Sequence, residues 1–196
     1  MNLQKKVEDL KKSTVKSKVD QKIKSFESKQ TNQEWFAEMC FCILTANSKA
    51  ETALNIEKKA GIKGFLEFPQ EKLAKIIRTN KHRFHNNKAK FIVQARKHKN
   101  IKDILKKQTS PRDWLVKNIK GLGLKESSHF LRNVGYKDYA IIDRHILKVL
   151  DEDKTITPKK YFEIENKLKQ MAKSLNLNLA ELDLYLWYIQ TGKILK

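Results

Sequence analysis

Apolar residues recur at spacings of three and four along this chain, and few residues interrupt them. Only six glycines and three prolines are spread over 196 residues, although these two residue types are the strongest breaks in helical structure. No segment alternates convincingly between apolar and polar residues, as a half-buried strand would. The pattern predicts an all-α protein, and the length suits one compact domain or two small lobes sharing a cleft.

The expected helices follow the apolar repeats and the residues that cap helices. A Lys-rich helix is expected from Leu3 to about Phe26. An almost wholly apolar one, from Glu34 to Thr45, should be buried in the core. The other expected helices cover residues 48–60, 70–79, 87–97, 111–119, 124–133 and 179–191, with two more after Asp143 and from Pro158.

A glycine turn, Gly121-Leu-Gly123, joins two of these helices. Such a turn leaves backbone N–H groups bare at a helix start, where a phosphate can bind. Glycine has no Cβ, so a DNA backbone can approach closely, and contacts to phosphate read no base sequence. The pattern indicates a helix–hairpin–helix, although an ordinary helical hairpin can have the same local sequence.

The net charge of +20 favours a polyanionic partner. Lysine and arginine total 42 against 22 acidic residues, and only six of the basic residues are arginines. Lysine-rich surfaces suit diffuse contact with phosphates more than bidentate reading of bases. An A·T-rich or thermophilic genome is the alternative cause of the lysine enrichment, but glutamate would then usually balance the lysine. We therefore expect a nucleic acid partner.

Two residues near the hairpin can carry chemistry. Lys125 follows the turn directly, and Asp143 begins the next helical run. An amine and a carboxylate beside a DNA backbone suffice to cut a glycosidic bond through a Schiff base. A free lysine has a pKa of about 10.4, so the amine needs a desolvated site among other cations. Asp143 could accept the amine proton or stabilise the positive sugar, and it could also be a plain N-cap.

The two cysteines, Cys40 and Cys42, predict neither a disulfide nor a metal site. On a helix they point about 200° apart, and a four-cysteine cluster is excluded by their number. The chain has no apolar run long enough for a membrane span and no apolar signal region near Met1. We expect a soluble monomer in the cytoplasm, associated with the nucleoid, with no membrane contact, no cofactor and no catalytic metal.

The hairpin with Lys125, and the segment Ile142-Asp143-Arg144-His145, resemble the helix–hairpin–helix DNA glycosylase superfamily. Lys120 stands where many relatives have proline, which is expected to loosen the turn without abolishing it. Further segments resemble the type 2, largely archaeal, 8-oxoguanine DNA glycosylase/AP lyases. They are Phe41 to Asn47, Arg83-Phe84 followed by Lys88-Ala89, and Leu186 to Lys196.

The resemblance implies a role for each matching residue. Lys125 would be the Schiff-base nucleophile and Asp143 the catalytic acid. Phe84 and Trp187 would stack on the two faces of a flipped base. The α-carboxylate of Lys196, the last residue, would accept hydrogen bonds from the Watson–Crick edge of that base.

Further roles concern DNA contacts and a cation. Asn47 would lie near the gap left in the duplex, and His145 would contact a phosphate. Asp183, one helical turn before Trp187, could line the same pocket. Without the resemblance, Asn47 reads equally well as a helix C-cap and Asp183 as a solvated helix residue. Carbonyls that could hold a monovalent cation at the hairpin, as in relatives, are those of Lys117, Ile119 and Leu122.

The resulting prediction is a single domain over residues 1–196, with two helical lobes around a basic cleft and the helix–hairpin–helix at its floor. Its expected function is excision of 8-oxoguanine from double-stranded DNA, followed by β-elimination at the abasic site. Two alternatives stay open. One is a glycosylase/lyase for another oxidised base, and the other is a non-catalytic helix–hairpin–helix DNA-binding protein.

Overall fold

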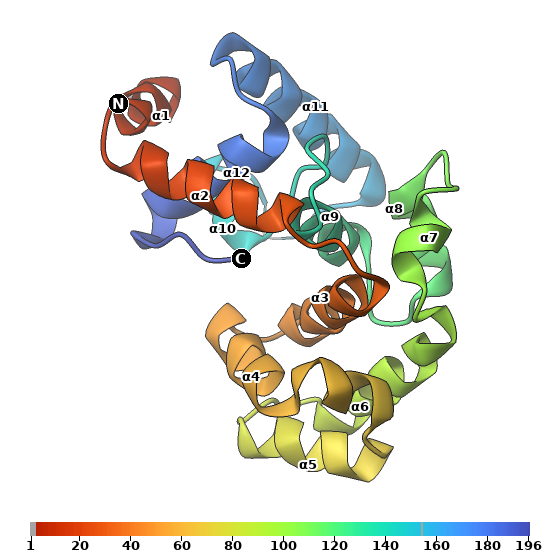
Figure 1. Cartoon of the computed structure of the whole chain (residues 1–196). Coiled ribbons are helices and arrows are strands. Elements are labelled where there is room, and N and C mark those ends of the chain that lie inside the picture. Colours follow the sequence, from red (N-terminus) through yellow and green to blue (C-terminus); the bar gives the residue numbers. More distant parts are fainter. Residues whose placement is uncertain (1–2, 154) are drawn as a thin grey trace. The chain divides into compact units, whose positions relative to one another are not determined.

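The computed structural model describes residues 3–153 and 155–196. The regular secondary structure in these residues consists entirely of helices (Figure 1). The all-α prediction is therefore confirmed. The chain divides into two compact units. Lys29–Phe130 form one, called here the central unit. The segments Met1–Ser28 and Leu131–Lys196 together form the other, called the terminal unit.

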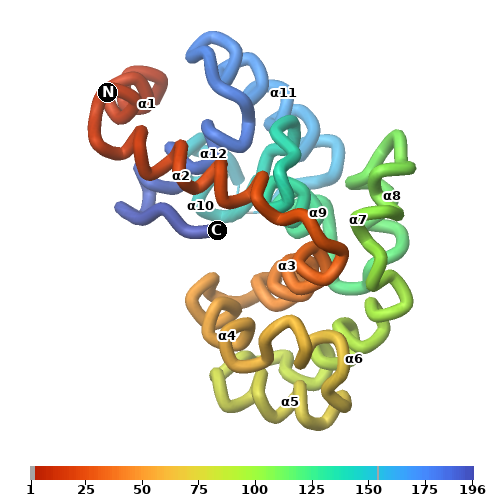
Figure 2. Tube along the Cα trace, viewed as in Figure 1, coloured from red at the N-terminus to blue at the C-terminus, as the bar shows by residue number. Residues whose placement is uncertain are grey.

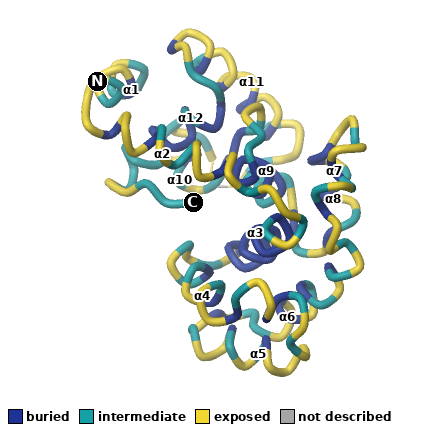
Figure 3. The backbone as a smooth tube through the Cα atoms, in the orientation of Figure 1, coloured by how far each residue is buried: buried dark blue, intermediate teal, exposed yellow. Residues whose placement is uncertain are grey.

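The central unit is built on α3 (Asn32–Thr45), the helix that the sequence predicted to be buried. Every residue from Trp35 to Thr45 is buried, and in Figure 3 most of the helix has the dark blue of buried residues. Helices α4, α6 and α7 pack against it, and α5 packs on α4 and α6. The bounds are α4 (Ala50–Glu67), α5 (Gln70–Thr79), α6 (His85–Ala95), η1 (Arg96–His98), α7 (Ile101–Leu105) and α8 (Pro111–Asn118).

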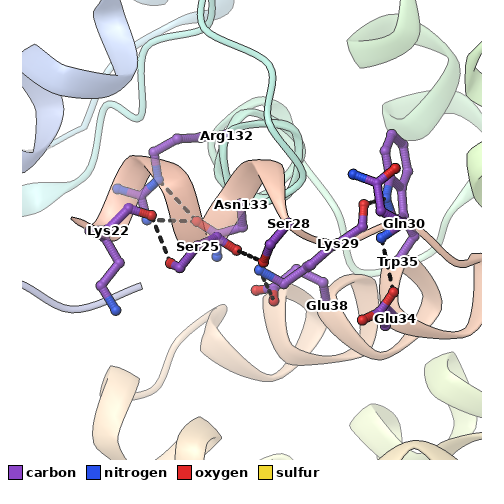
Figure 4. Close-up of polar contacts among 10 residues, drawn as sticks. All are labelled: Lys22, Ser25, Ser28, Lys29, Gln30, Glu34, Trp35, Glu38, Arg132 and Asn133. Atoms are coloured by element: carbon purple, nitrogen blue, oxygen red, sulfur yellow. Dashed lines mark hydrogen bonds and ion pairs between the residues drawn. The ribbon is translucent and has the colours of Figure 1, made fainter. Parts of the chain in front are cut away.

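The start of α3 is fixed by a reciprocal capping box between Thr31 and Glu34. The Glu34 N–H donates to Thr31 Oγ1 at 3.1 Å, while Glu34 Oε2 accepts from the N–H groups of Thr31 and Gln30. These backbone donors lower the pKa of Glu34. One turn further on, the buried Glu38 is paired with Lys29, whose carbonyl accepts the indole N–H of Trp35 (Figure 4).

The terminal unit is centred on α12 (Leu179–Thr191), in which Leu179, Ala180 and every residue from Leu182 to Leu186 are buried. Helix α12 contacts α1, α2, α10 and α11, as the trace in Figure 2 allows the reader to follow. The bounds are α1 (Leu3–Lys11), α2 (Val15–Glu27), α10 (Arg144–Val149) and α11 (Pro158–Ser174). Helix α9 (Leu124–Asn133) begins in the central unit and ends in the terminal one.

The single helix expected from Leu3 to Phe26 is wrong, because α1 ends at Lys11 and α2 begins at Val15. Ser13 lies at the break. Its hydroxyl donates to the carbonyl of Leu10 at 2.8 Å and accepts from the N–H of Val15 at 3.2 Å. A serine hydroxyl that binds nearby backbone groups offers them an alternative to helical pairing. Apolar periodicity continues through the break and conceals it.

Other helix limits agree with the sequence more closely. Helices α5 and α12 have the predicted bounds, and α4 departs from helical geometry at Gly61, one residue after its predicted end. Helix α7 and the short helix η1 were not anticipated. Cys40 and Cys42 are buried, and neither forms a disulfide. Within the described chain, no helix is both long enough and apolar enough to cross a membrane.

Candidate active site

The predicted helix–hairpin–helix is present in the central unit. Helix α8 ends at Asn118, Ile119 caps it, and α9 starts at Leu124. The turn between them is closed by the Leu122 N–H, which donates to the carbonyl of Ile119 at 3.2 Å. The carbonyl of Ile119, one of the three predicted cation ligands, therefore already accepts a hydrogen bond within the turn. The described residues include no cluster of three or more His, Cys, Asp or Glu side chains that could hold a metal ion.

The two glycines of the hairpin have different requirements. Gly121 has φ +93°, and a Cβ there would lie 2.8 Å from Cδ2 of Phe91. Gly123 has no positive φ, and its Cβ would meet only Glu126 Oε2 at 3.4 Å. Only Gly121 is therefore required by the fold itself.

Gly121→Ala is expected to lower the free energy of unfolding by about 1–3 kcal/mol, because an L-residue is strained at this φ and Phe91 must move. Gly123→Ala is the matched control and should cost under about 1 kcal/mol. Urea denaturation of the two variants measures the difference. Equal losses would show that the glycine turn does not constrain the hairpin.

Lys125 is the second residue of α9, and its side chain is 31% exposed. Its Nζ lies 2.8 Å from Oε1 of Glu126, whose other oxygen accepts the N–H of Gly123 at 3.4 Å. Glu126 thus connects the hairpin backbone to the predicted nucleophile. Sequence reasoning missed this contact, although the two residues are adjacent.

A second cation lies buried in the same unit. Lys88 is 4% exposed, and its Nζ donates to the carbonyl of Ile43 at 2.7 Å. Burial lowers the pKa of Lys88 to about 8, the charge of Glu126 opposes this shift, and the charge of Lys125 adds to it. The charges of Lys88, Lys125 and Glu126 therefore act on one another. The predicted nucleophile, Lys125, therefore has a buried cation among its charged neighbours.

Side chains donate hydrogen bonds to the last carbonyl groups of α3. Ile43 accepts from Lys88, Leu44 from His82 at 2.9 Å, and Cys42 from the hydroxyl of Thr45 at 2.9 Å. Backbone pairing runs out in the last turn of a helix, so these side-chain donors stabilise the end of α3.

Two predicted site residues are connected to this end of α3. Asn47 follows it in the sequence, and Phe84 is linked to it by the hydrogen bonds of His82. Asn47 is exposed and left-handed (φ 62°), a conformation that asparagine tolerates, and it follows the C-cap Ala46 instead of capping α3 itself. Phe84 is half-buried and is the N-cap of α6. Its N–H donates to Nδ1 of His82 at 3.2 Å, and the guanidinium of Arg83 lies 4.4 Å from the centre of its ring.

In the terminal unit, Asp143 is the N-cap of α10, as predicted. Its Oδ1 accepts from the N–H groups of His145 and Ile146 at 2.9 and 3.0 Å, and Oδ2 takes part in neither bond. The ring of His145 meets the ring of Trp187 edge-on, with 4.7 Å between centroids. Nε1 of Trp187 is buried, and no described residue accepts its hydrogen. Three of the predicted site residues are thus brought together.

Asp183 lies one turn before Trp187 on α12, but it is not a solvated residue. It is buried and forms an ion pair with Arg132. Burial raises the pKa of Asp183 to about 6, the charge of Arg132 opposes this, and the charge of Asp143 adds to it. Arg132 also donates to the side-chain oxygen of Asn133 (both are labelled in Figure 4). A contact between Asp183 and a base stays a prediction.

The predicted residues are divided between the two units. Within the central unit the structure brings together the hairpin and Lys125, and connects Phe84 to the end of α3. Within the terminal unit it brings together Asp143, His145 and Trp187. The assembly of both groups into one site, with a basic cleft, stays a prediction. Lys196 is half-buried in the terminal unit.

The chain is similar to several known proteins. A family model described as 8-oxoguanine DNA glycosylase matches residues 17–177. The 8-oxoguanine DNA glycosylase/AP lyase of Methanocaldococcus jannaschii is 50% identical over the full length of both chains. That of Korarchaeum cryptofilum is 42% identical over 95% of this chain and 94% of its own.

Solved structures give the same relatives. The Methanocaldococcus jannaschii 8-oxoguanine glycosylase/lyase, crystallised with a 15mer DNA containing 8-oxoguanine, has a TM-score of 0.95 and 50% identity over all of both chains. The 8-oxoguanine DNA glycosylase of Thermotoga maritima has a TM-score of 0.90 and 36% identity, and the match covers 99% of this chain and 98% of that one.

Proposed function

This chain belongs to the 8-oxoguanine DNA glycosylase/AP lyase family, and we propose that Lys125 is the nucleophile of both reactions. The two reactions of the protein are excision of 8-oxoguanine from DNA and cleavage of the strand at the abasic site. The observation that carries the role of Lys125 is its position. It is partly exposed at the first turn of α9, directly after the glycine hairpin. Backbone N–H groups at a helix start are suited to hold the phosphates of the damaged strand.

The chemistry proceeds through an imine. The neutral amine of Lys125 attacks C1′ of the damaged nucleotide, and the base leaves with the electrons of the glycosidic bond. The nitrogen loses a proton, and the sugar ring then opens: the C1′–O4′ bond breaks, O4′ takes up a proton, and the Schiff base forms between the lysine nitrogen and C1′. Removal of a C2′ proton then expels the 3′ phosphate and breaks the strand. The attack on C1′ needs an unprotonated amine, so Glu126 must release Lys125 first.

Asp143 is placed to stabilise the charge that develops on the sugar. Its Oδ1 is held by two backbone N–H groups of α10, so the carboxylate has a fixed orientation. A fixed negative charge beside the developing positive sugar lowers the barrier without reorganisation. The same carboxylate can accept a proton as the base departs.

We assign recognition of the base to Phe84, Trp187 and Lys196. Aromatic rings on both faces of a flipped base give stacking, and a carboxylate accepts hydrogen bonds from the Watson–Crick edge of a guanine. The unpartnered indole N–H of Trp187 is a further donor available in this region of the described chain. We also assign Asn47 to the gap in the duplex, Gly121, Gly123 and His145 to phosphate contact, and Asp183 to the base pocket through Arg132.

A tag that extends the chain beyond Lys196 should lower 8-oxoguanine excision by about tenfold or more. A charge-assisted hydrogen bond contributes roughly 1.5–3 kcal/mol, and about 1.4 kcal/mol corresponds to a factor of ten in rate. Lyase activity on a preformed abasic site should change much less, because no base is recognised there. The matched control is the same tag placed at the N-terminus. Equal excision by the two tagged proteins would exclude the carboxylate from recognition.

The proposed partner is double-stranded DNA containing 8-oxoguanine, bound by a cytoplasmic monomer associated with the nucleoid. The test is a panel of duplexes with different oxidised bases, each assayed for excision and for trapping by borohydride, which reduces the imine to a stable link. Preference for 8-oxoguanine with trapping supports the proposal. Preference for another lesion would change the substrate, and absence of trapping would favour a non-catalytic DNA-binding protein.

A further inference from the structure

We propose that His82 is a positioning residue for base excision, because its ring connects the last turn of α3 to the backbone of Phe84. The inference rests on the base-stacking role proposed above for Phe84. His82 lies in the connection between α5 and α6 and is only 3% exposed. In the sequence, His82 directly precedes Arg83 and Phe84 but is not part of the segment that resembles the glycosylase family.

The two ring nitrogens of His82 have different partners. Nε2 lies 2.9 Å from the carbonyl of Leu44, and Nδ1 lies 3.2 Å from the N–H of Phe84. A backbone N–H can only donate, so Nδ1 must be the acceptor. The ring proton then resides on Nε2, which donates to Leu44. One neutral tautomer satisfies both bonds, whereas a protonated ring cannot accept from Phe84.

The backbone of Phe84 is held on both sides: its N–H donates to His82, and its carbonyl, at the N-cap of α6, accepts the N–H of Lys88 at 2.9 Å. The aromatic side chain is half-buried, its neighbour Arg83 is exposed, and the guanidinium of Arg83 rests against the ring. The preceding turn passes through Lys81 in the left-handed region, with φ 61°. His82 ties this turn to α3, whose C-terminal end leads within three residues to Asn47. A misplaced stacking ring is costly, since displacements of about 1 Å can lower rates roughly a hundredfold.

The surroundings of His82 keep its ring neutral. Burial lowers the pKa of His82, and the nearby charges of Lys88 and His85 lower it further, while the bond to Leu44 opposes them. Neutral His82 accepts from Phe84 at and above neutral pH. As pH falls through the lowered pKa, protonation removes that acceptor. Excision of 8-oxoguanine should then fall relative to lyase activity on a preformed abasic site, because Lys125 and Asp143 serve both reactions.

Two isosteric variants separate the two bonds. In His82→Asn, the side-chain oxygen occupies the place of Nδ1 and can still accept from Phe84, but the bond to Leu44 is lost. In His82→Gln, the amide nitrogen occupies the place of Nε2 and can still donate to Leu44, but the acceptor for Phe84 is lost. Phe84→Leu is the reference for loss of stacking.

Single-turnover excision of 8-oxoguanine and cleavage of an abasic duplex are measured for each variant. We expect His82→Gln and Phe84→Leu to lower excision by about tenfold or more, and His82→Asn by less than about threefold, with abasic cleavage changed less than about twofold throughout. Equal losses in the two His82 variants would overturn the proposal, as would normal excision by Phe84→Leu.

If the His82 variants fail to fold, the wild-type protein decides. Its ratio of excision to abasic cleavage, followed from pH 8 down to pH 5, should fall in the acid range, and a constant ratio would overturn the proposal. Should the wild type excise a different lesion, the proposed substrate fails, and the same ratio with that lesion still tests His82.

Discussion

Lys125→Gln is expected to abolish both excision of 8-oxoguanine and covalent trapping by borohydride, because glutamine cannot form an imine. The side chain is partly exposed and its ion pair with Glu126 contributes under about 1 kcal/mol, so the variant should fold. DNA affinity should be nearly unchanged, since one positive charge is lost among 42 basic residues. Excision, trapping and affinity are measured on the same duplex.

Lys120→Gln is the matched control for the change in charge. Lys120 is an exposed lysine of the same hairpin, five residues earlier, so its loss removes one charge and no proposed nucleophile. It should keep excision and trapping. Trapping retained by Lys125→Gln would assign the imine to another lysine. Lys88 would then be examined first, because its pKa of about 8 leaves part of its amine unprotonated.

Asp143→Asn should lower turnover by roughly a hundredfold or more, the scale of a lost proton-transfer or electrostatic partner. The amide oxygen of asparagine can replace Oδ1 as acceptor for the N–H groups of His145 and Ile146. Asparagine is as good an N-cap as aspartate, so stability should fall by less than about 1 kcal/mol. Single-turnover rates and urea denaturation separate the two effects.

Thr157→Ala supplies the control for capping alone. Thr157 caps α11 through the N–H of Lys160, and no catalytic role is assigned to it. Its loss should cost about 1 kcal/mol of stability and leave turnover unchanged. A folded Asp143→Asn protein with normal turnover would restrict Asp143 to the capping role.

The parts of the fold that the sequence predicted are those with local physical causes. A capping box marks each of two helix starts, at Thr31 and at Asn178, and Pro158 occupies the first position of α11. Gly192, in the left-handed region, ends α12 as a glycine C-cap should. The break at Ser13 escaped prediction because one hydroxyl competes with the helix while the apolar spacing continues.

The candidate site was only partly predictable. Lys125 and Asp143 follow recognisable local patterns, and the structure places both at helix starts. Their partners are set by tertiary packing. Arg132 lies 51 residues before Asp183, and His82 lies 38 residues after Leu44. No local signal connects residues so far apart, so ion pairs and hydrogen bonds of this kind required the structure.

The discontinuity of the terminal unit has a consequence for how the protein is made. Helices α1 and α2 are synthesised before the central unit, yet they contact α12, which is synthesised after it. The central unit lies between them as one uninterrupted stretch and can fold while synthesis continues. Lys125 would therefore be in place before Asp143 and Trp187 can pack. A nascent chain carrying the proposed nucleophile would lack the rest of the proposed machinery until α12 has been synthesised.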